Sequence, residues 1–531
     1  MLRRNWKPIA ATALGVGTSV YMYRKYRRPT TQTFDIAVKE MGADGKPTTV
    51  NRTFPLQSMD DVNRRIREHA VLKTKSTPEG LVWKYATGYL ASNDPIEDAN
   101  AQAIIDKDPT TSSSSGQLLF FTVMDGHAGR HTSRLLSSVL IPAVALELST
   151  LVNDTDTPLS KTSILDSVKS LLFSKSDPHM ALDSDPKLVS QAIQRAFLNL
   201  DIEIVNAPLH ILASEVDQGA IDKRLIPDLS KHPMGEATML PAMSGSCALM
   251  ALLDTSHRDL YVACTGDSRA VAGIWEETED GQGKWRVEVL SEDQTGRNPN
   301  EVKRMQSEHP ASEAADVIKR GRVLGGLEPT RAFGDARYKW SREAQEILSQ
   351  AFLAGNGKAM RPTSPAFKTP PYVTANPVVT HRKLTIPDKT STDASTKSKP
   401  TFRFLVLATD GLWDQLSSEE VVALVGGYLA GLKGTVPKSS LPSMVPTTAG
   451  SPTVEGKDKN RKAGEGSWSF VDDNVSAHLI RNAFGGGDEG RLRRLLSIPA
   501  PFSRRWRDDV TVTVVWWDEE QEEATTVKAK L

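Results

Sequence analysis

Two hydrophobic segments of this chain each run into the dipeptide Asp-Gly, and this pattern restricts the possible folds more than any other feature of the sequence. Residues 118–124 are apolar and end at Asp125, and residues 404–408 are apolar and lead to Asp410. Apolar runs of this length are typical of buried β-strands. A carboxylate at the end of a buried strand is costly to desolvate unless a cation neutralises it. The pattern therefore predicts two core strands that each end in an acid.

A third acid, Asp508, stands just before an apolar strand predicted over residues 510–517. If that strand runs antiparallel to the other two, its beginning lies beside their ends, and three carboxylates meet at one edge of the core. The local sequence supplies no matching cluster of Lys or Arg, so repulsion would raise the pKa of these acids unless a cation lay among them. Oxygen ligands favour Mg²⁺ or Mn²⁺ over zinc. The alternative for each Asp-Gly pair taken alone is an ordinary turn.

The remaining segments mix helical and strand periods. Residues 131–147 carry apolar side chains at helical spacing, and Asp185-Pro186 has the residues of a helix start. The apolar runs 260–264 and 269–275 flank the turn sequence Thr265–Ser268, which predicts a β-hairpin. Strands joined by hairpins, with helices elsewhere, predict an α+β fold in which largely antiparallel sheets are covered by helices.

Composition excludes several classes of protein. Lys and Arg together number 65, as do Asp and Glu, so the chain has no excess positive charge of the kind that marks nucleic-acid binding. Its two cysteines, Cys247 and Cys264, are too few for a disulfide framework or a four-cysteine zinc site.

The N-terminal residues 1–34 differ from the rest of the chain. They contain several Arg and Lys residues and no acid, which is typical of a mitochondrial presequence. The uncharged run 8–23 is shorter than the roughly 17–25 residues that a membrane-spanning helix needs. A short inner-membrane anchor formed by this run, and a disordered basic tail, both remain open alternatives.

The rest of the chain is predicted to form one domain over residues 60–531. Three segments near residues 107–117, 355–400 and 434–467 are rich in Ser, Thr, Pro, Gly and Lys. Such segments bury too little apolar surface to offset their ordering entropy. They are therefore predicted to be surface insertions within that domain.

Six short motifs occur in the order found in the type 2C (PPM-type, metal-dependent) serine/threonine protein phosphatases, which this chain resembles. They are Phe121–Gly129, Ser244–Ser246, Thr265–Ala270, Arg331–Asp335, Ala408–Asp414 and Arg507–Val512. Within that family, residues 92–98, 301–310 and 472–480 resemble the mitochondrial pyruvate dehydrogenase phosphatases. The resemblance implies a four-layer α-β-β-α sandwich with two central antiparallel sheets.

The resemblance also implies a ligand set for two divalent metal ions. Asp125 would bridge the two ions. Asp410 and Asp508 would complete the protein ligands of the first ion. Glu97 and the backbone carbonyl of Gly126 would bind the second.

Further roles follow from the same resemblance. Asp98 would lie behind the metal ligands, and Asp267 and Asp414 would hold a third, more weakly bound ion. His127 would act as the general acid that protonates the leaving serine or threonine oxygen. Many family members carry a phosphate-binding arginine where this chain has Asn93, so phosphate binding here is expected to depend more on the metals.

The implied activity is hydrolysis of phosphoserine and phosphothreonine by a water activated by Mg²⁺ or Mn²⁺. The implied partner is a phosphoprotein substrate, with the pyruvate dehydrogenase complex as the candidate, in the matrix or at the inner membrane or intermembrane space of mitochondria. Two alternatives remain. One is a catalytically silent pseudophosphatase that binds phosphoproteins, and the other is a different two-metal hydrolase, such as a phosphodiesterase.

Overall fold

The structure is a computed structural model, and it describes residues 32–41, 46–77, 80–107, 116–151, 185–216, 225–277, 282–386, 400–449 and 465–519. The uncharged run 8–23 and the rest of the chain up to residue 31 lie outside the described residues, as do the centres of the three expected insertions, 108–115, 387–399 and 450–464. The mitochondrial presequence expected over residues 1–34 therefore stays a prediction.

A seven-stranded sheet forms one half of the core, in the order β19-β12-β11-β17-β21-β4-β3. Its neighbours pair antiparallel except β12 and β19, which run parallel. Its strands are β3 (Val71–Ser76), β4 (Leu81–Leu90), β11 (Arg269–Glu277), β12 (Gly283–Val289), β17 (Thr401–Ala408), β19 (Thr447–Thr448) and β21 (Val510–Glu519). The strands predicted over residues 404–408 and 510–517 are therefore confirmed, and they lie side by side.

A five-stranded antiparallel sheet forms the other half, in the order β16-β10-β9-β6-β5. Its strands are β5 (Ala99–Asp106), β6 (Gln117–Met124), β9 (Ala248–Asp254), β10 (Asp259–Thr265) and β16 (Val378–Lys383). Every residue of β6 is buried, as the apolar run 118–124 predicts.

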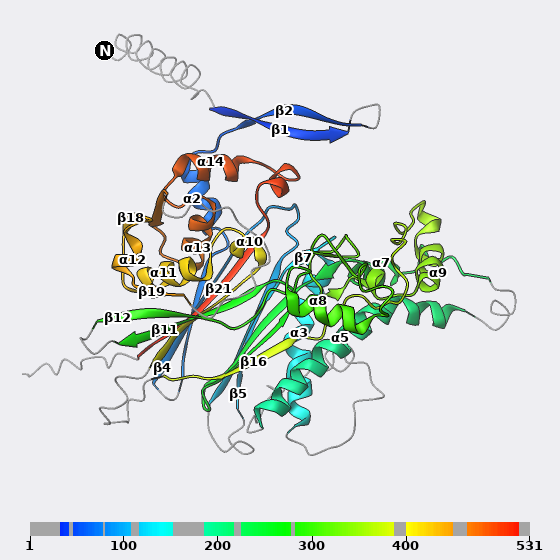
Figure 1. Cartoon of the computed structure of the whole chain (residues 1–531), viewed down its shortest axis with the longest axis horizontal. Helices are drawn as coiled ribbons and strands as arrows, with labels where there is room; N and C mark the ends of the chain where they lie inside the picture. The colour runs from blue at the N-terminus through cyan, green and yellow to red at the C-terminus, as the bar shows by residue number, and fades with distance from the viewer. Residues whose placement is uncertain are drawn as a thin grey trace, which may run out of the picture.

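Helices cover both sheets (Figure 1). The apolar sides of α2 (Met59–Arg67), α11 (Ser418–Leu429), α13 (Val475–Phe484) and α14 (Glu489–Ser497) share a core with the seven-stranded sheet. The helices α3 (His131–Thr150) and α5 (Pro186–Glu215) share a core with the five-stranded sheet. A third apolar cluster takes side chains from both sheets, including Trp83, Phe121 and Leu407. The fold is mixed α and β, with antiparallel sheets and covering helices, as expected.

Both helices of the five-stranded side begin as the sequence predicts. The side chain of Asp185 accepts a hydrogen bond from the Lys187 backbone amide, which caps α5. The helix expected over residues 131–147 is α3. α3 and α5 are long and apolar enough to pass for membrane spans by composition, but both share a hydrophobic core with the five-stranded sheet.

Smaller elements surround this core. A two-stranded ribbon, β1 (Thr33–Met41) with β2 (Pro47–Pro55), precedes the domain start expected at residue 60 (Figure 1). The others are β7 (Gly126–His127), α7 (Gly235–Met243), β8 (Gly245–Ser246), α8 (Pro299–Glu308), β13 (Ile318–Lys319), β14 (Arg322–Val323), β15 (Phe333–Gly334), α9 (Arg342–Phe352), α10 (Asp410–Trp413), β18 (Gly434–Pro437), α12 (Leu441–Met444), β20 (Ser467–Phe470) and the 3₁₀ turns η1 (Ala336–Tyr338), η2 (Ala354–Asn356) and η4 (Phe502–Arg505).

The predicted hairpin over residues 260–275 is wrong. β10 and β11 lie in different sheets, and the segment Thr265–Ser268 carries the chain from one sheet to the other. Side chains of both strands meet in the cluster between the sheets, among them Val262 and Ala272. The two strands therefore face each other across the core instead of sharing a hydrogen-bond ladder.

The described parts of two expected insertions are more ordered than their composition suggests. Residues 378–383 form β16, which pairs with β10 at the edge of the five-stranded sheet, and Phe367 and Tyr372 are buried. Residues 434–449 contain β18, α12 and β19, with Val436 and Leu441 buried. A few apolar side chains at the right positions are enough to attach these segments to the core, so the prediction of loops is wrong for them.

Candidate metal centre and active site

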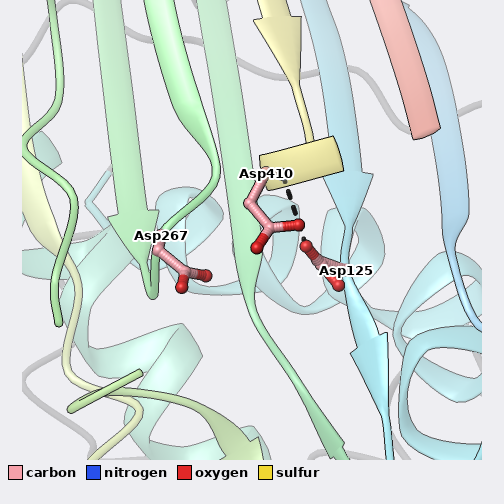
Figure 2. A group of neighbouring side chains, drawn as sticks. All are labelled: Asp125, Asp267 and Asp410. Atoms are coloured by element: carbon pink, nitrogen blue, oxygen red, sulfur yellow. Dashed lines mark hydrogen bonds between the residues drawn. The ribbon is translucent and has the colours of Figure 1, made fainter. Parts of the chain in front are cut away.

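Three carboxylates converge where the two sheets meet. Asp125 directly follows β6, Asp410 begins α10 just after β17, and Asp267 lies in the segment between β10 and β11. One oxygen atom from each of the three lies within 4.8 Å of the others. Figure 2 shows the three side chains pointing toward one another, with the Asp410 amide donating a hydrogen bond to Asp125 Oδ2 at 3.4 Å.

The buried negative charges of this group would be stabilised by a bound cation. Desolvation, together with the charge of Asp410, raises the pKa of Asp125 well above its usual range. Desolvation, together with the charge of Asp509, does the same to the pKa of Asp98. One oxygen of Asp98 accepts hydrogen bonds from Thr409 and Thr511 at 2.9 and 2.8 Å, while the other is buried without a partner among the described residues.

This donor set fits a hard divalent cation. The three clustered groups offer only carboxylate oxygens, which suit Mg²⁺ or Mn²⁺. A bound cation would relieve both the mutual repulsion of Asp125, Asp267 and Asp410 and the cost of desolvating them. The residues present therefore fit the metal that the sequence predicts.

Asp508 and Asp414 lie outside this group of three. The carboxylate of Asp508 forms an ion pair with Arg504 and accepts a hydrogen bond from the Asp509 amide at 2.7 Å. Asp414 directly follows α10 as its C-cap residue, and its amide donates to the carbonyl of Asp410 at 2.6 Å. The structure thus brings Asp267 into the central group, where the sequence-based expectation placed Asp508.

Glu97 is held in place by Asn93 and Asp509. The Asn93 side-chain amide donates to Asp509 at 2.9 Å and to Glu97 at 3.3 Å, and the Glu97 backbone amide donates to Asp509 at 2.9 Å. The other carboxylate oxygen of Glu97 accepts from the Gly129 amide at 2.8 Å. Asn93 therefore orients two acids, and sequence reasoning missed Asp509 because its partners lie some four hundred residues away.

Gly126 has no room for a side chain. A Cβ at this position would lie 2.1 Å from the backbone oxygen of Glu97. Glycine therefore lets the segment after β6 approach the segment before β5, so the backbones at Asp125 and Glu97 lie close together in space.

His127 forms a short contact with Asp335, its Nε2 lying 2.6 Å from Oδ2. Burial alone would lower the pKa of His127, but the charge of Asp335 and its hydrogen bond outweigh that effect and raise it. The pair forms because β7, β8 and β15 make a small three-stranded sheet that joins three sequence motifs. A Cβ on Gly245 of β8 would lie 2.0 Å from His127 Nε2 and 2.3 Å from Asp335 Oδ2.

Sequence reasoning did not assign a role to Asp335 or Arg504. Asp335 ends the motif Arg331–Asp335, which was the available signal. The motif's first residue is structural, because Arg331 forms a buried ion pair with Glu301 at 2.7 Å. Arg504 lies on η4, with its guanidinium at the acidic edge.

Comparison with known proteins finds a matching family and several relatives. Residues 96–430 match the family described as protein phosphatase 2C. A protein phosphatase 2C homolog of Schizosaccharomyces pombe is 34% identical over 97% of this chain and 96% of its own length. The mitochondrial [pyruvate dehydrogenase [acetyl-transferring]]-phosphatase 1 of Saccharomyces cerevisiae is 36% identical, over 82% of this chain and 69% of its own length. The human mitochondrial [pyruvate dehydrogenase [acetyl-transferring]]-phosphatase 2 is 32% identical, over 89% of this chain and 86% of its own length.

Among solved structures, the serine-threonine phosphatase 2C of Toxoplasma gondii aligns with 85% of this chain and 98% of its own, at 16% identity and a TM-score of 0.41.

Proposed function

The chain belongs to the protein phosphatase 2C family, and we propose that it hydrolyses phosphoserine and phosphothreonine in proteins. The observation that carries this proposal is the meeting of Asp125, Asp267 and Asp410 at the junction of the sheets, beside the His127–Asp335 pair. Bound Mg²⁺ or Mn²⁺ would supply a water of lowered pKa and neutralise charge on the phosphoryl group.

Different acids of the chain would be the ligands of the two ions. We assign Asp125 to both ions, Asp410 and Asp508 to the first, and Glu97 with the Gly126 carbonyl to the second. A third, weaker ion would take Asp267 and Asp414. An oxygen of Asp267 lies within 4.8 Å of oxygens of Asp125 and Asp410, which supports a role for Asp267 close to the centre of the site.

His127 would protonate the leaving serine or threonine oxygen. Asp335 favours the charged imidazolium and fixes the direction of the ring, which are the properties that a general acid needs. Because Nε2 of His127 is bonded to Asp335, the proton would leave from Nδ1, and the carboxylate of Asp335 stabilises the imidazolium until that transfer.

The substrate and location are proposed from the relatives' names. Several relatives are named mitochondrial pyruvate dehydrogenase phosphatases, so we place this chain in mitochondria, imported through residues 1–34, with the pyruvate dehydrogenase complex as its substrate. Phosphoproteomics of mitochondria that lack this chain tests the assignment. If the dehydrogenase phosphosites do not rise, the substrate is a different phosphoprotein.

We also propose the four-layer α-β-β-α order for the fold. Three apolar clusters support it. One lies between the two sheets, and one lies under the helices on each side.

Phosphopeptide hydrolysis by the purified chain tests the activity. Turnover is expected to stop with a chelator and to return with Mn²⁺. Asp125→Asn is expected to lower kcat by about a thousandfold or more, since it removes charge at the centre of the metal site. Folded protein without metal-dependent turnover would contradict the proposal and favour the phosphoprotein-binding pseudophosphatase.

A further inference from the structure

A basic pocket lies next to the proposed reaction centre. It has a volume of about 540 Å³ and lies between the start of α3 and the helix α7. Arg130, His131 and Arg134 line one side, and Pro233, Leu240 and Pro241 are among the residues of the other. Glu236 is the pocket's one acid. Two arginines against one glutamate leave the pocket with an excess of positive charge.

The side chains of the two arginines make no polar interaction that stabilises the described fold. Neither Arg130 nor Arg134 has a side-chain hydrogen bond or ion pair to another described residue. Arg130 precedes α3 without capping it through its side chain, and the first turn of α3 contains no acid. The helix dipole therefore adds to the positive potential of the pocket instead of being neutralised.

The pocket adjoins the metal-binding edge through a short chain of contacts. The Gly129 amide donates to Glu97 at 2.8 Å. A Cβ on Gly129 would lie 3.3 Å from the ring of His131. His131 lines the pocket, so the pocket is within reach of the residues that flank a phosphate bound at the acids.

Hydrogen bonds connect the wall of the pocket to the His127–Asp335 pair. The Thr132 hydroxyl shares its one proton between the backbone oxygens of Pro241 and Ser244, at 2.8 and 2.9 Å. The Ser244 oxygen also accepts from the Asp335 amide at 3.0 Å. The start of α3, the end of α7 and Asp335 therefore form one hydrogen-bonded unit, and a group bound in the pocket is held in register with His127.

We propose that this pocket binds an anionic side chain of the substrate segment that flanks the phosphorylated residue. The inference rests on the proposed phosphatase function and adds a specificity site to it. Complementary charge selects and orients a partner, and the arginines of the pocket offer that charge to an anionic side chain. A carboxylate and a second phosphoryl group share the chemistry that the arginines recognise.

Matched phosphopeptides test the proposal. A phosphoserine peptide carries glutamate, a second phosphoserine or the uncharged isostere glutamine at each flanking position in turn, and kcat/KM is measured with Mn²⁺. The wild-type chain is expected to favour at least one anionic peptide over its glutamine counterpart by about fivefold, the range of a partly exposed ion pair. The glutamate and second-phosphoserine series show which anion the pocket prefers.

Variants of Arg134 locate that preference. Arg134→Ala is expected to bring the ratio of anionic to glutamine peptide close to one, and Arg134→Glu to reverse it in favour of a lysine-flanked peptide. The matched control is Arg64→Ala, an exposed arginine on α2 in the opposite helical layer, which is expected to keep the wild-type ratio.

Three outcomes would overturn the proposal. They are a wild-type chain that shows no preference for any anionic peptide, an Arg134→Glu variant that keeps the wild-type ratio, and an Arg64→Ala control that changes the ratio as much as Arg134→Ala. Failure of the phosphatase function itself looks different, because then no peptide of the set is hydrolysed.

Discussion

At the scale of single residues, the hydrogen bond between His127 and Asp335 bears most directly on the proposed phosphate hydrolysis. A general acid matters most when the leaving group is a poor one. His127→Ala is therefore expected to lower kcat on a phosphoserine peptide by about 10²- to 10⁴-fold and to lower it much less on p-nitrophenyl phosphate, whose phenolate leaves without protonation. Asp335→Asn is expected to give a smaller loss with the same dependence on the leaving group.

The two substrates provide the internal control for this prediction. Equal losses on both substrates would mean that His127 holds the metals or the fold instead of donating a proton. Gly245→Ala is a useful companion variant, since its added methyl group would displace the His127–Asp335 pair from β8. It is expected to share the leaving-group dependence of Asp335→Asn.

Arg504 is a second residue whose position suggests a role. Its guanidinium is paired with Asp508. Desolvation raises the pKa of Glu97, and the charge of Arg504 offsets part of that rise. Asn93, where the family resemblance leads us to expect a phosphate-binding arginine, instead orients Asp509 and Glu97. Arg504→Ala is therefore expected to weaken product inhibition by inorganic phosphate by about tenfold, within the range for a charge-assisted hydrogen bond.

The neighbouring residue provides the control for Arg504. Arg505 lies on the same 3₁₀ turn and is exposed, so Arg505→Ala is expected to leave the phosphate inhibition constant as in the wild type. An unchanged inhibition constant in Arg504→Ala, together with weakened Mn²⁺ binding, would assign this arginine to the metal ligand Asp508 instead.

Among single residues, the sequence predicts those site residues that have a recognisable pattern beside them in the chain. Asp125 and Asp410 follow apolar strands, and that neighbourhood alone marks them as costly, paired acids. Asp335 and Asp509 have no such signal. Their partners His127 and Asn93 lie hundreds of residues away, and only the folded chain brings them together.

Among the secondary structure elements, β10 and β11 show why periodicity is not enough to assign topology. Both are short apolar strands on either side of a turn sequence, which is also the pattern of a hairpin. Residues 378–383 instead supply the edge partner of β10 from a segment whose composition predicts a loop. The strands β10 and β11 were readable from the sequence, whereas the strand β16 and the choice of pairing partners depended on long-range packing.

Helix α13 carries a buried histidine whose titration can be measured. His478 is fully buried, and its Nε2 has no hydrogen-bond partner among the described residues. Desolvation lowers its pKa to about 4. Below its ordinary pKa of about 6.5, the unfolded chain therefore takes up a proton here that the folded chain does not take up until about pH 4. Stability is thus expected to fall as the pH drops through this window, by about 3 kcal/mol in total.

Urea unfolding at a series of pH values checks this expectation. His478→Gln is expected to lose this part of the pH dependence. His210→Gln, at an exposed position on α5, is expected to keep it. If the two variants and the wild type share one slope between pH 6.5 and about 4, His478 does not stay neutral in the fold.

On the scale of the whole molecule, the site exists because two sheets meet. β6 belongs to one sheet and β17 to the other, and the chain crosses between the sheets at Asp267. The mixed fold and the approach of Asp125 to Asp410 were predictable from the sequence. The place of Asp267 in the centre was not, because it depends on a crossing that looks like a hairpin.

Binding of Mn²⁺ to the purified chain, measured by isothermal titration calorimetry, tests the central claim most directly. Wild-type protein is expected to bind Mn²⁺, and Asp125→Asn and Asp410→Asn are each expected to weaken binding by at least about tenfold, since each removes a charged oxygen ligand. Asp259→Asn, a half-buried acid at the start of β10 that pairs with His381, is the control and is expected to bind as the wild type does. Equal affinity in all four proteins would contradict a metal centre built from the acids at the junction of the sheets.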